Sequence, residues 1–370
     1  MTAVARERRQ EAAVHELEVG AYTVPTDAPE ADGTLDWDAT TIVVVHAHAG
    51  EHSGVGYTYA DVSTATLVRS ELADVVRGMD AFAPQAAWAE MVRAIRNLGR
   101  PGVSSMAIAA VDSALWDLKA RLLELPLCRL LGMARDSVPV YGSGGFTSYS
   151  PAALAEQLSG WVEQGIPRVK MKVGTSPELD PARVLTAREA IGPNTELFVD
   201  ANGAYDRKQA LSLAERFRAE AEVSWFEEPV SSDDLEGLAL MRDRAPSGMQ
   251  IAAGEYGYDL PYFRRMAPCV DVLQADVTRC AGITELLRVD GLCRAHGLGL
   301  SLHCGPSIHL HPALALDRLV HLEYFHDHSR IERMLFDGVV APSSGALHPS
   351  LDRPGNGLEF MRSEAGRYAA

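Results

Sequence analysis

The sequence predicts an α/β protein in which an N-terminal α+β domain precedes a barrel of alternating strands and helices. Two observations support this prediction. Eight short apolar segments follow one another between residues 138 and 325, and a stretch of helical character separates each from the next. The chain before them has a different pattern, in which a hairpin is followed by one long helix. Eight βα units favour a closed parallel barrel over the alternative, an open doubly wound sheet.

The N-terminal pattern begins with a β-hairpin. The segment "TTIVVVHAHAGEHSGVGYTY", residues 40–59, contains a β-branched run, a glycine-containing turn and a second short strand. From Ser104, apolar residues recur at spacings of three and four, which predicts a long amphipathic helix that breaks before Pro126. Gly132 is expected to end this helical region. We place a domain boundary near Arg135.

The barrel strands are expected at eight places. In chain order they are "VPVYGSG", "RVKMKV", "ELFVD", "VSWFEEP", "QIAAGE", "VDVLQAD", "LGLSLH" and "HLEYF". The glycine-rich "VYGSGG" is compatible with a dinucleotide-binding turn. No GxGxxG opens a helix there, so a dinucleotide fold is disfavoured.

Composition limits the function classes. A chain of 370 residues with 47% hydrophobic and 23% charged residues is typical of a globular protein with a large core. A net charge of -16 argues against a nucleic-acid surface. No apolar run reaches membrane-spanning length, and "MTAVARERRQEAAVHELEV" lacks the apolar core of a secretion signal, so we expect a cytoplasmic protein without a membrane partner. The five cysteines form no CxxC pair, which disfavours a disulfide framework or a zinc cluster.

Polar residues end seven of the expected strands, spaced by about one βα unit. They are Lys172, Asp200, Glu227, Glu255, Asp276, His303 and Glu323. A single acidic residue at such a place is more often a helix cap. Barrel enzymes, however, build their active sites at the carboxyl ends of the strands, so seven residues in this register predict one ring of functional groups.

Three of these residues are carboxylates on consecutive strands: Asp200, Glu227 and Glu255. Without a partner such a cluster repels itself and takes up protons, whereas a hard divalent cation with oxygen ligands, such as Mg²⁺, stabilises it. Lys170 and Lys172 share one face of the preceding strand. A solvated edge strand is one explanation for them. The other is that both lysines face the acidic cluster and a substrate carboxylate.

Taken together, these motifs resemble one family. The segments "VKMKVG", "FVDANGAY", "WFEEP", "AAGE", "QADVTRCAGIT", "SLHCGPS" and "LEYF", in that order, are similar to the mandelate racemase subgroup of the enolase superfamily. The match spans nearly the whole chain, including "ALWDLKARLLELPLCRLLG" and the closing "PGNGLEF". One departure is Ala281, where the family usually has glycine, and it affects only the expected shape of that loop.

The resemblance implies a modified TIM barrel, (β/α)₇β, with a capping domain formed by both chain ends. The expected parts are a capping domain at 1–135, a barrel at 136–335 and a C-terminal segment at 336–370 that returns to the capping domain. It also implies a homo-oligomer and Mg²⁺ held by Asp200, Glu227 and Glu255. The other implied roles are Lys172 as one base, Lys170 binding the substrate carboxylate, His303 paired with Asp276 as the opposite base or acid, and Glu323 as hydrogen-bond donor to the enolate.

The implied chemistry is removal of the proton next to a carboxylate. This step creates a dianion, so a metal ion, a lysine and a protonated acid must share the new charge; the superfamily is known for pairing a lysine or histidine base with Mg²⁺. For Lys172 to act as a base, its pKa must fall towards neutrality, and Lys170 and the metal favour that fall. Asp276 is expected to orient His303.

Three functions agree with these residues. The first is a dehydratase that converts an acid sugar to a 2-keto-3-deoxy acid, the second is a racemase or epimerase, and the third is a non-catalytic protein that binds sugar acids. We favour the dehydratase because the polar segment "TVPTDAPEADGTLDWD", residues 23–38, is expected to form a lid loop suited to a polyol. Asn202 is expected either to contact the substrate or to cap the next helix.

Overall fold

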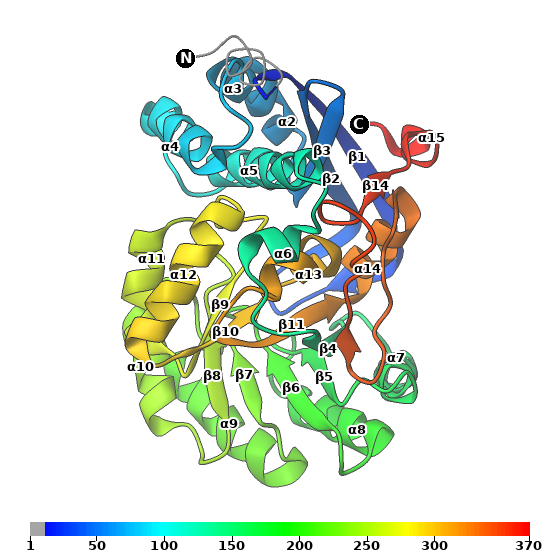
Figure 1. The fold of residues 1–370 in the computed structure, drawn as a ribbon. Coiled ribbons are helices and arrows are strands. Elements are labelled where there is room, and N and C mark those ends of the chain that lie inside the picture. The colour runs from blue at the N-terminus through cyan, green and yellow to red at the C-terminus, as the bar shows by residue number, and fades with distance from the viewer. Residues whose placement is uncertain (1–11) are drawn as a thin grey trace.

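The computed structural model describes residues 12–370, so residues 1–11, on which the predicted lack of a secretion signal partly rests, lie outside the described residues. In Figure 1 the barrel lies below, and the domain built from the start of the chain covers one end of it. The C-terminal segment lies beside β1 and β2 of that domain, on the same side of the barrel. No helix within 12–370 has the length and apolar character needed to cross a membrane.

The capping domain is built on a three-stranded antiparallel sheet in the order β1-β2-β3. Its strands are β1 (Val14–Ala31), β2 (Asp36–Ala49) and β3 (His52–Tyr59), so the predicted hairpin is confirmed. The long predicted helix is α5 (Val103–Leu122), which packs directly on β3. Gly54 and Gly56 allow this close approach, because a Cβ atom at either position would overlap with the α5 backbone.

Smaller helical elements complete this domain. They are α2 (Ser63–Leu67), η1 (Val68–Leu72), α3 (Ala73–Val76), α4 (Pro84–Ala94) and η2 (Ile95–Asn97), followed after α5 by α6 (Leu127–Leu131). Gly132 follows α6 in a left-handed conformation, as a helix-ending glycine should.

The structure corrects the expectation of a lid loop at residues 23–38, because most of this segment is β-structure. β1 runs to Ala31 and β2 starts at Asp36, so only residues 32–35 form a turn. Cross-strand pairing explains the difference: Glu30 pairs with Trp37, and the hydroxyl groups of Thr23 and Thr41 lie 2.8 Å apart. A register shift between Pro25 and Glu30 interrupts the regular pattern. We call residues 27–41 the lid hairpin.

The second domain is a closed barrel of eight parallel strands, which confirms the predicted fold class and excludes the open sheet. The strands follow chain order from β4 to β11, and pairing of β11 with β4 closes the ring. They are β4 (Val138–Gly144), β5 (Arg168–Lys172), β6 (Glu196–Asp200), β7 (Trp225–Glu227), β8 (Gln250–Ala253), β9 (Val272–Ala275), β10 (Gly299–Leu302) and β11 (Leu319–Phe325).

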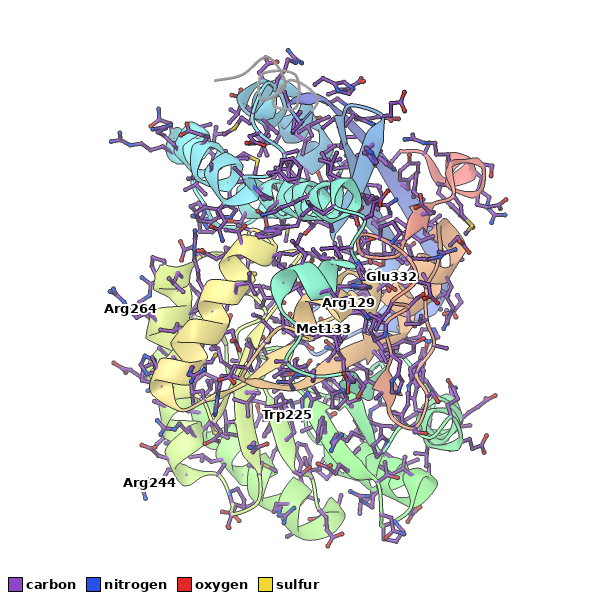
Figure 2. All side chains as sticks on the ribbon, in the orientation of Figure 1. Arg129, Met133, Trp225, Arg244, Arg264 and Glu332 are labelled. Atoms are coloured by element: carbon purple, nitrogen blue, oxygen red, sulfur yellow. The ribbon has the colours of Figure 1, made fainter. Side chains whose placement is uncertain are left out.

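Helices cover the outside of this barrel. They are α7 (Pro151–Glu163), α8 (Asp180–Ile191), α9 (Arg207–Ala221), α10 (Leu235–Arg244), α11 (Leu260–Met266), η3 (Ala267–Cys269), α12 (Ile283–His296), α13 (Pro306–Ala313) and α14 (His326–Leu335). Inside the barrel, a layer of inward-facing side chains forms the floor beneath the strand ends. It includes Tyr141, Phe198 and Trp225, and Figure 2 labels Trp225 among the barrel strands. The rings of Phe198 and Trp225 stack with their centroids 5.3 Å apart.

The C-terminal segment contacts both domains. Its short strand β13 (Ala346–Leu347) pairs with β4, and β14 (Glu359–Phe360) pairs with β12 (Phe336–Asp337). The segment ends with α15 (Arg362–Ala365) and η4 (Gly366–Tyr368), and the backbone amide of Ala370 donates to the carbonyl of Ala21 in β1. The predicted boundaries near residues 135 and 335 stay a prediction.

Asp117 joins the capping domain to this returning segment. Its buried carboxylate accepts hydrogen bonds from the Val55 amide at 2.7 Å, the Asn356 amide at 2.6 Å and the Arg121 guanidinium at 2.7 Å. We expect Asp117→Ala to lower the free energy of unfolding by about 3 kcal/mol, because it leaves these donors unpaired. Glu359→Gln is the control, since exposed Glu359 contacts the same Arg121 and its loss should cost less than about 1 kcal/mol. Equal urea midpoints for the two variants would contradict this role of Asp117.

Candidate active site

The parallel register of the barrel brings the predicted strand-end residues together. Lys172 on β5 is the direct partner of Asp200 on β6, and Asp200 is the partner of Glu227 on β7. Since neighbouring parallel strands lie about 4.8 Å apart, these side chains meet at one edge of the barrel. The two lysines of β5 are buried and face inward, which excludes the solvated edge strand considered from the sequence.

Asp200, Glu227 and Glu255 form a compact group that we call the carboxylate cluster. One oxygen from each lies within 4.8 Å of the others, and all three residues are buried. Burial, followed by the charge of Asp200, raises the pKa of Glu227 to about 8. The Oε2 atom of Glu255 accepts no hydrogen bond from any residue in 12–370. This donor set consists of oxygens only, as a hard divalent cation prefers.

Charge balance around the cluster also fits a divalent cation. Six carboxyl groups surround the strand ends: Asp200, Glu227, Glu228, Glu255, Asp276 and Glu323. Four groups can oppose them with positive charge: Lys170, Lys172, Arg279 and protonated His303. Full ionisation of both sets would leave two negative charges in excess. Burial and the neighbouring carboxylates raise the pKa of Glu227 to about 8 and that of Glu228 well above its usual value, so bound protons relieve this excess without a cation, and one divalent ion would neutralise it instead.

Lys170 lies beneath the cluster and is fully buried. Its ammonium nitrogen lies 2.7 Å from Glu227 Oε1, 2.8 Å from Glu323 Oε1 and 3.3 Å from Asp200 Oδ2, and it stands over the ring of Tyr141. The family resemblance implies that Lys170 binds the substrate carboxylate, but its ammonium group already contacts three carboxylates of the protein. That assignment stays a prediction, and the geometry instead gives Lys170 a place in the support of the cluster.

Lys172 lies higher in the barrel and lines a cavity at its mouth. Its ammonium nitrogen is 2.5 Å from Asp200 Oδ2. Burial lowers the pKa of Lys172, but the combined attraction of the Asp200, Glu255 and Glu323 carboxylates outweighs burial, so the net shift is upward. The expected fall towards neutrality is therefore not produced by the protein's own groups. A cation bound to Asp200 would compete with this attraction and favour the neutral amine.

His303 and Asp276 are paired as predicted. The Nδ1 atom of His303 lies 2.9 Å from Asp276 Oδ2, and its Nε2 atom lies 3.3 Å from Glu255 Oε2. Burial opposes the imidazolium form, but Glu255 and Asp276 raise the pKa of His303 overall. Burial likewise opposes ionisation of Asp276, yet the hydrogen bond with His303 lowers its pKa. This arrangement favours the protonated form of the imidazole at the cavity wall.

Glu323 lies close to both Lys170 and His303. Its Oε2 atom accepts from the Cys304 amide at 3.1 Å and lies 3.8 Å from His303 Nε2. Burial opposes its ionisation, but Lys170 holds the pKa of Glu323 well below the ordinary value. The implied role of a protonated donor stays a prediction, because the carboxylate next to Lys170 is an acceptor.

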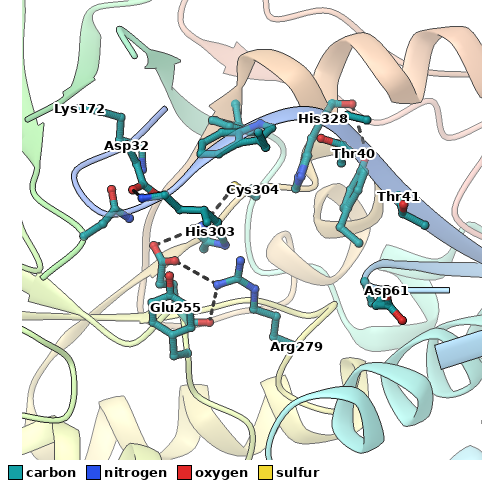
Figure 3. A pocket seen from close by; sticks show the side chains of 18 residues that line it. Asp32, Thr40, Thr41, Asp61, Lys172, Glu255, Arg279, His303, Cys304 and His328 are labelled. Atoms are coloured by element: carbon teal, nitrogen blue, oxygen red, sulfur yellow. Dashed lines mark hydrogen bonds and ion pairs between the residues drawn. The ribbon is translucent and has the colours of Figure 1, made fainter. Parts of the chain in front are cut away.

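A cavity of about 370 Å³ opens above these groups, between the barrel mouth and the capping domain. Lys172, Glu255 and His303 line it from the barrel, and Asp32, Leu35 and Trp37 line it from the lid hairpin. Figure 3 shows the interactions that join Glu255 to both His303 and Arg279 at the cavity wall. The two candidate bases thus belong to one cavity that the capping domain completes.

Comparison with known proteins identifies the family. The model of the mandelate racemase / muconate lactonizing enzyme N-terminal domain matches residues 23–132, and that of the enolase C-terminal domain-like family matches residues 153–364. The chain belongs to the mandelate racemase/muconate lactonizing enzyme family of the enolase superfamily.

Similar members of the superfamily include enzymes that act on sugar acids. The 3,6-anhydro-alpha-L-galactonate cycloisomerase of Streptomyces coelicolor is 31% identical over 96% of this chain and 99% of its own. A crystal structure of a mandelate racemase/muconate lactonizing enzyme-like protein from Rubrobacter xylanophilus is 62% identical, with TM-score 0.96 over 97% of this chain and 100% of that one. L-talarate/galactarate dehydratase from Salmonella typhimurium, solved with Mg and L-lyxarohydroxamate, is 26% identical, with TM-score 0.89 over 100% of this chain and 95% of that one.

Arg279 is a site residue of this mandelate racemase family member that sequence reasoning missed. Its guanidinium lies 3.0 Å from Glu255 Oε1 and stands over the ring of Tyr256. Arg279 lines the cavity, so it both positions Glu255 and offers positive charge to a bound anion. Arg279 lies three residues after Asp276, in a loop that the strand-end pattern does not include. The sequence could still have indicated it, because an arginine so close to a predicted catalytic carboxylate is a candidate site residue.

Asn202 also lines the cavity. The backbone N–H of Asn202 donates to Asp200 Oδ1 at 2.9 Å. The side-chain Oδ1 atom of Asn202 is buried and accepts no hydrogen bond from any residue in 12–370. The helix-cap alternative is wrong, because Asp206 caps α9 through the amides of Lys208 and Gln209. Contact with substrate is the remaining prediction for this side chain.

The family departure at Ala281 changes little in the site. Ala281 adopts the left-handed conformation, with φ 67°, that a glycine would take more easily. Its buried carbonyl accepts from Trp88 of the capping domain at 2.9 Å. The loop therefore keeps the glycine-type shape.

Proposed function

We propose that this protein is a Mg²⁺-dependent enzyme that removes the proton α to the carboxylate of an acid sugar and expels a hydroxyl group as water. The observation that carries the proposal is the placement of Lys172 and His303. They enter the same cavity from β5 and β10, which are separated by β4 and β11 around the ring, with the carboxylate cluster beside them. A substrate carbon held between them is accessible from two sides.

The residues divide into three tasks. Asp200, Glu227 and Glu255 would hold Mg²⁺, and the charge balance of the cluster supports this assignment. When bound, Mg²⁺ supplies positive charge that stabilises the enediolate form of the substrate. Lys170 and Arg279 hold the carboxylates in place from below and from the side.

Lys172 and His303 would move the protons. Neutral Lys172 takes the proton from carbon two of the substrate. The electron pair of the broken carbon–hydrogen bond then forms a double bond between carbons two and three, while the bond from carbon three to its hydroxyl group breaks. His303 gives its proton to that hydroxyl group, which departs as water. Asp276 supports this role because it keeps the imidazole oriented and charged before transfer. The resulting enol tautomerises to the 2-keto-3-deoxy acid.

The polar lining of the cavity favours a polyhydroxylated substrate. Asp32, Thr40 and Thr41 face it from the lid hairpin, and Asn202 and Arg279 face it from the barrel (Figure 3). The similarity to L-talarate/galactarate dehydratase supports dehydration of such a substrate. The similarity to 3,6-anhydro-alpha-L-galactonate cycloisomerase, which extends over nearly the whole chain, favours a cycloisomerase as the second candidate.

A substrate panel distinguishes the candidates. Purified protein with Mg²⁺ would be incubated with mono- and diacid sugars and with anhydro and lactone forms of sugar acids, and the products analysed by mass spectrometry and by a 2-keto-acid assay. A dehydratase gives a keto acid lighter by one water. A cycloisomerase or a racemase gives a product of unchanged mass, and a racemase gives no keto group. Failure of every sugar acid, with exchange on an aromatic 2-hydroxy acid, would refute the acid-sugar proposal.

The lid hairpin gives a further prediction. Gly33 at its tip packs so closely on the barrel that a Cβ atom there would overlap with the carbonyl oxygens of Ala201 and Val173. We expect Gly33→Val to displace the tip and lower kcat/KM by about 10- to 100-fold, with Mg²⁺ binding unchanged. Thr34→Ser is the matched control, because Thr34 is exposed and serine keeps the hydroxyl group that donates to Asp32. Equal kcat/KM in both variants would remove the tip from the site.

A further inference from the structure

A second group of ligand-type side chains lies where the lid hairpin meets the barrel. Asp27 and Glu30 belong to the last part of β1, and His326 is the first residue of α14, directly after β11. One ligand atom from each of the three lies within 4.8 Å of the other two. We call Asp27, Glu30 and His326 the lid cluster; none of its members belongs to the carboxylate cluster.

Glu30 is the unusual member of the lid cluster. It is only 1% exposed, and its Oε2 atom accepts from the indole nitrogen of Trp37 at 2.8 Å. Its Oε1 atom is buried and has no hydrogen-bond partner in residues 12–370. A buried carboxylate oxygen without a partner is costly, and burial accordingly raises the pKa of Glu30 to about 8. A positively charged ligand at this place would offset that cost in place of a proton.

Arg330, a basic side chain whose charge acts on Glu30, is already engaged. Arg330 binds Asp327 at 2.6 Å and the carbonyl of Pro25 at 2.7 Å. His326 Nε2 lies 3.0 Å from Asp27 Oδ2. One imidazole nitrogen and two carboxylates, with a position left open, form a donor set typical of Zn²⁺, whereas Mg²⁺ prefers oxygen ligands only.

The lid cluster is accessible from outside. A cavity of about 620 Å³ is lined by Asp27 and His326 together with Tyr149 and Gln157 of the barrel. An ion could therefore reach the cluster without passing through the candidate active site. Trp37, which holds Glu30, lines the active-site cavity, so the cluster is linked to that cavity through one hydrogen bond.

We propose that Asp27, Glu30 and His326 bind a divalent transition-metal ion of the zinc type, which fastens the lid hairpin to the start of α14. This site would be separate from the Mg²⁺ site in donor atoms and in location. The proposal does not depend on the reaction assigned to the barrel, because its evidence lies in the lid hairpin and α14.

The test is metal stoichiometry in the full-length protein. Protein in excess Mg²⁺ would be dialysed against Zn²⁺, and bound zinc counted by elemental mass spectrometry. We expect one zinc ion per chain in the wild type and affinity at least about 100-fold weaker in His326→Gln and Asp27→Asn, since each loses a ligand. Asp27 is 46% exposed in its side chain, so Asp27→Asn carries the test if His326→Gln fails to fold.

Two control variants make the result specific. His296→Gln removes an exposed histidine at the end of α12 and should leave zinc binding unchanged. Cys304→Ser removes the thiol of the rival group His303, Cys304 and Glu323, whose ligand atoms also lie within 4.8 Å of one another. Zinc should also change the fluorescence of the wild type but not of Trp37→Phe. Absence of bound zinc in the wild type, or its loss in Cys304→Ser and retention in His326→Gln, would overturn the proposal.

Discussion

Glu227→Gln is expected to abolish Mg²⁺ binding in the calorimetric range and to lower kcat by at least about 1,000-fold. The variant removes one charge from three buried carboxylates that lie within 4.8 Å of one another. It should remain folded, because the same change removes a carboxyl group whose burial and repulsion by Asp200 together raise the pKa of Glu227 to about 8. Its thermal midpoint in the presence of a chelator should therefore equal or exceed that of the wild type.

Glu196→Gln is the matched control for this variant. Glu196 begins β6, at the opposite end of the strand that carries Asp200, and its exposed side chain pairs with Arg168. We expect wild-type Mg²⁺ affinity and turnover in the control. Unchanged Mg²⁺ affinity in Glu227→Gln would count strongly against the carboxylate cluster as the metal site.

The second large effect concerns the two proton-transfer residues. Lys172→Ala should lose both net turnover and exchange of the substrate α-proton with solvent deuterium, because no base remains on that side. His303→Asn should lose turnover by at least about 1,000-fold but keep exchange, since the intermediate still forms and returns. The difference follows from Asp276 and Glu255, which favour the protonated form of His303 and so suit it to donate.

Arg168→Ala and His296→Asn are controls for these replacements. Arg168 begins the strand that Lys172 ends, and His296 ends α12 on the protein surface. Exchange lost in His303→Asn and retained in Lys172→Ala would reverse the two roles. Near-normal product formation in either variant would remove that residue from the mechanism.

The sequence was sufficient for the barrel because its strands are short, apolar and regularly spaced. A polar residue lies at or within two residues of the end of each of seven strands, and the parallel register then brings Lys172, Asp200 and Glu227 side by side. The same pattern could not predict β1, whose outer half is rich in polar residues and contains a register shift. The turn of the lid hairpin was therefore expected to be much longer than the four residues that form it.

The sequence pattern could not predict the protonation states of the site residues. The low pKa expected for Lys172 was based on the charges of Lys170 and a metal ion. The contact of 2.5 Å with Asp200, which raises this pKa, arises only from the register of the folded strands. Similarly, the sequence does not show that Lys170 lies between Glu227 and Glu323, or that Arg279 reaches back to Glu255. These contacts join residues from different strands and loops, and only the closed barrel defines them.

The most direct test of α-proton abstraction at this site is proton NMR of acid sugars incubated with the wild-type protein and Mg²⁺ in D₂O. For at least one sugar acid we expect loss of the carbon-two proton signal together with a keto-acid product that carries solvent deuterium at carbon three. A chelator should stop both changes, and added Mg²⁺ should restore them. A folded, Mg²⁺-bound protein that leaves the α-proton of every sugar acid in place, or a product formed with that proton retained, would contradict the account.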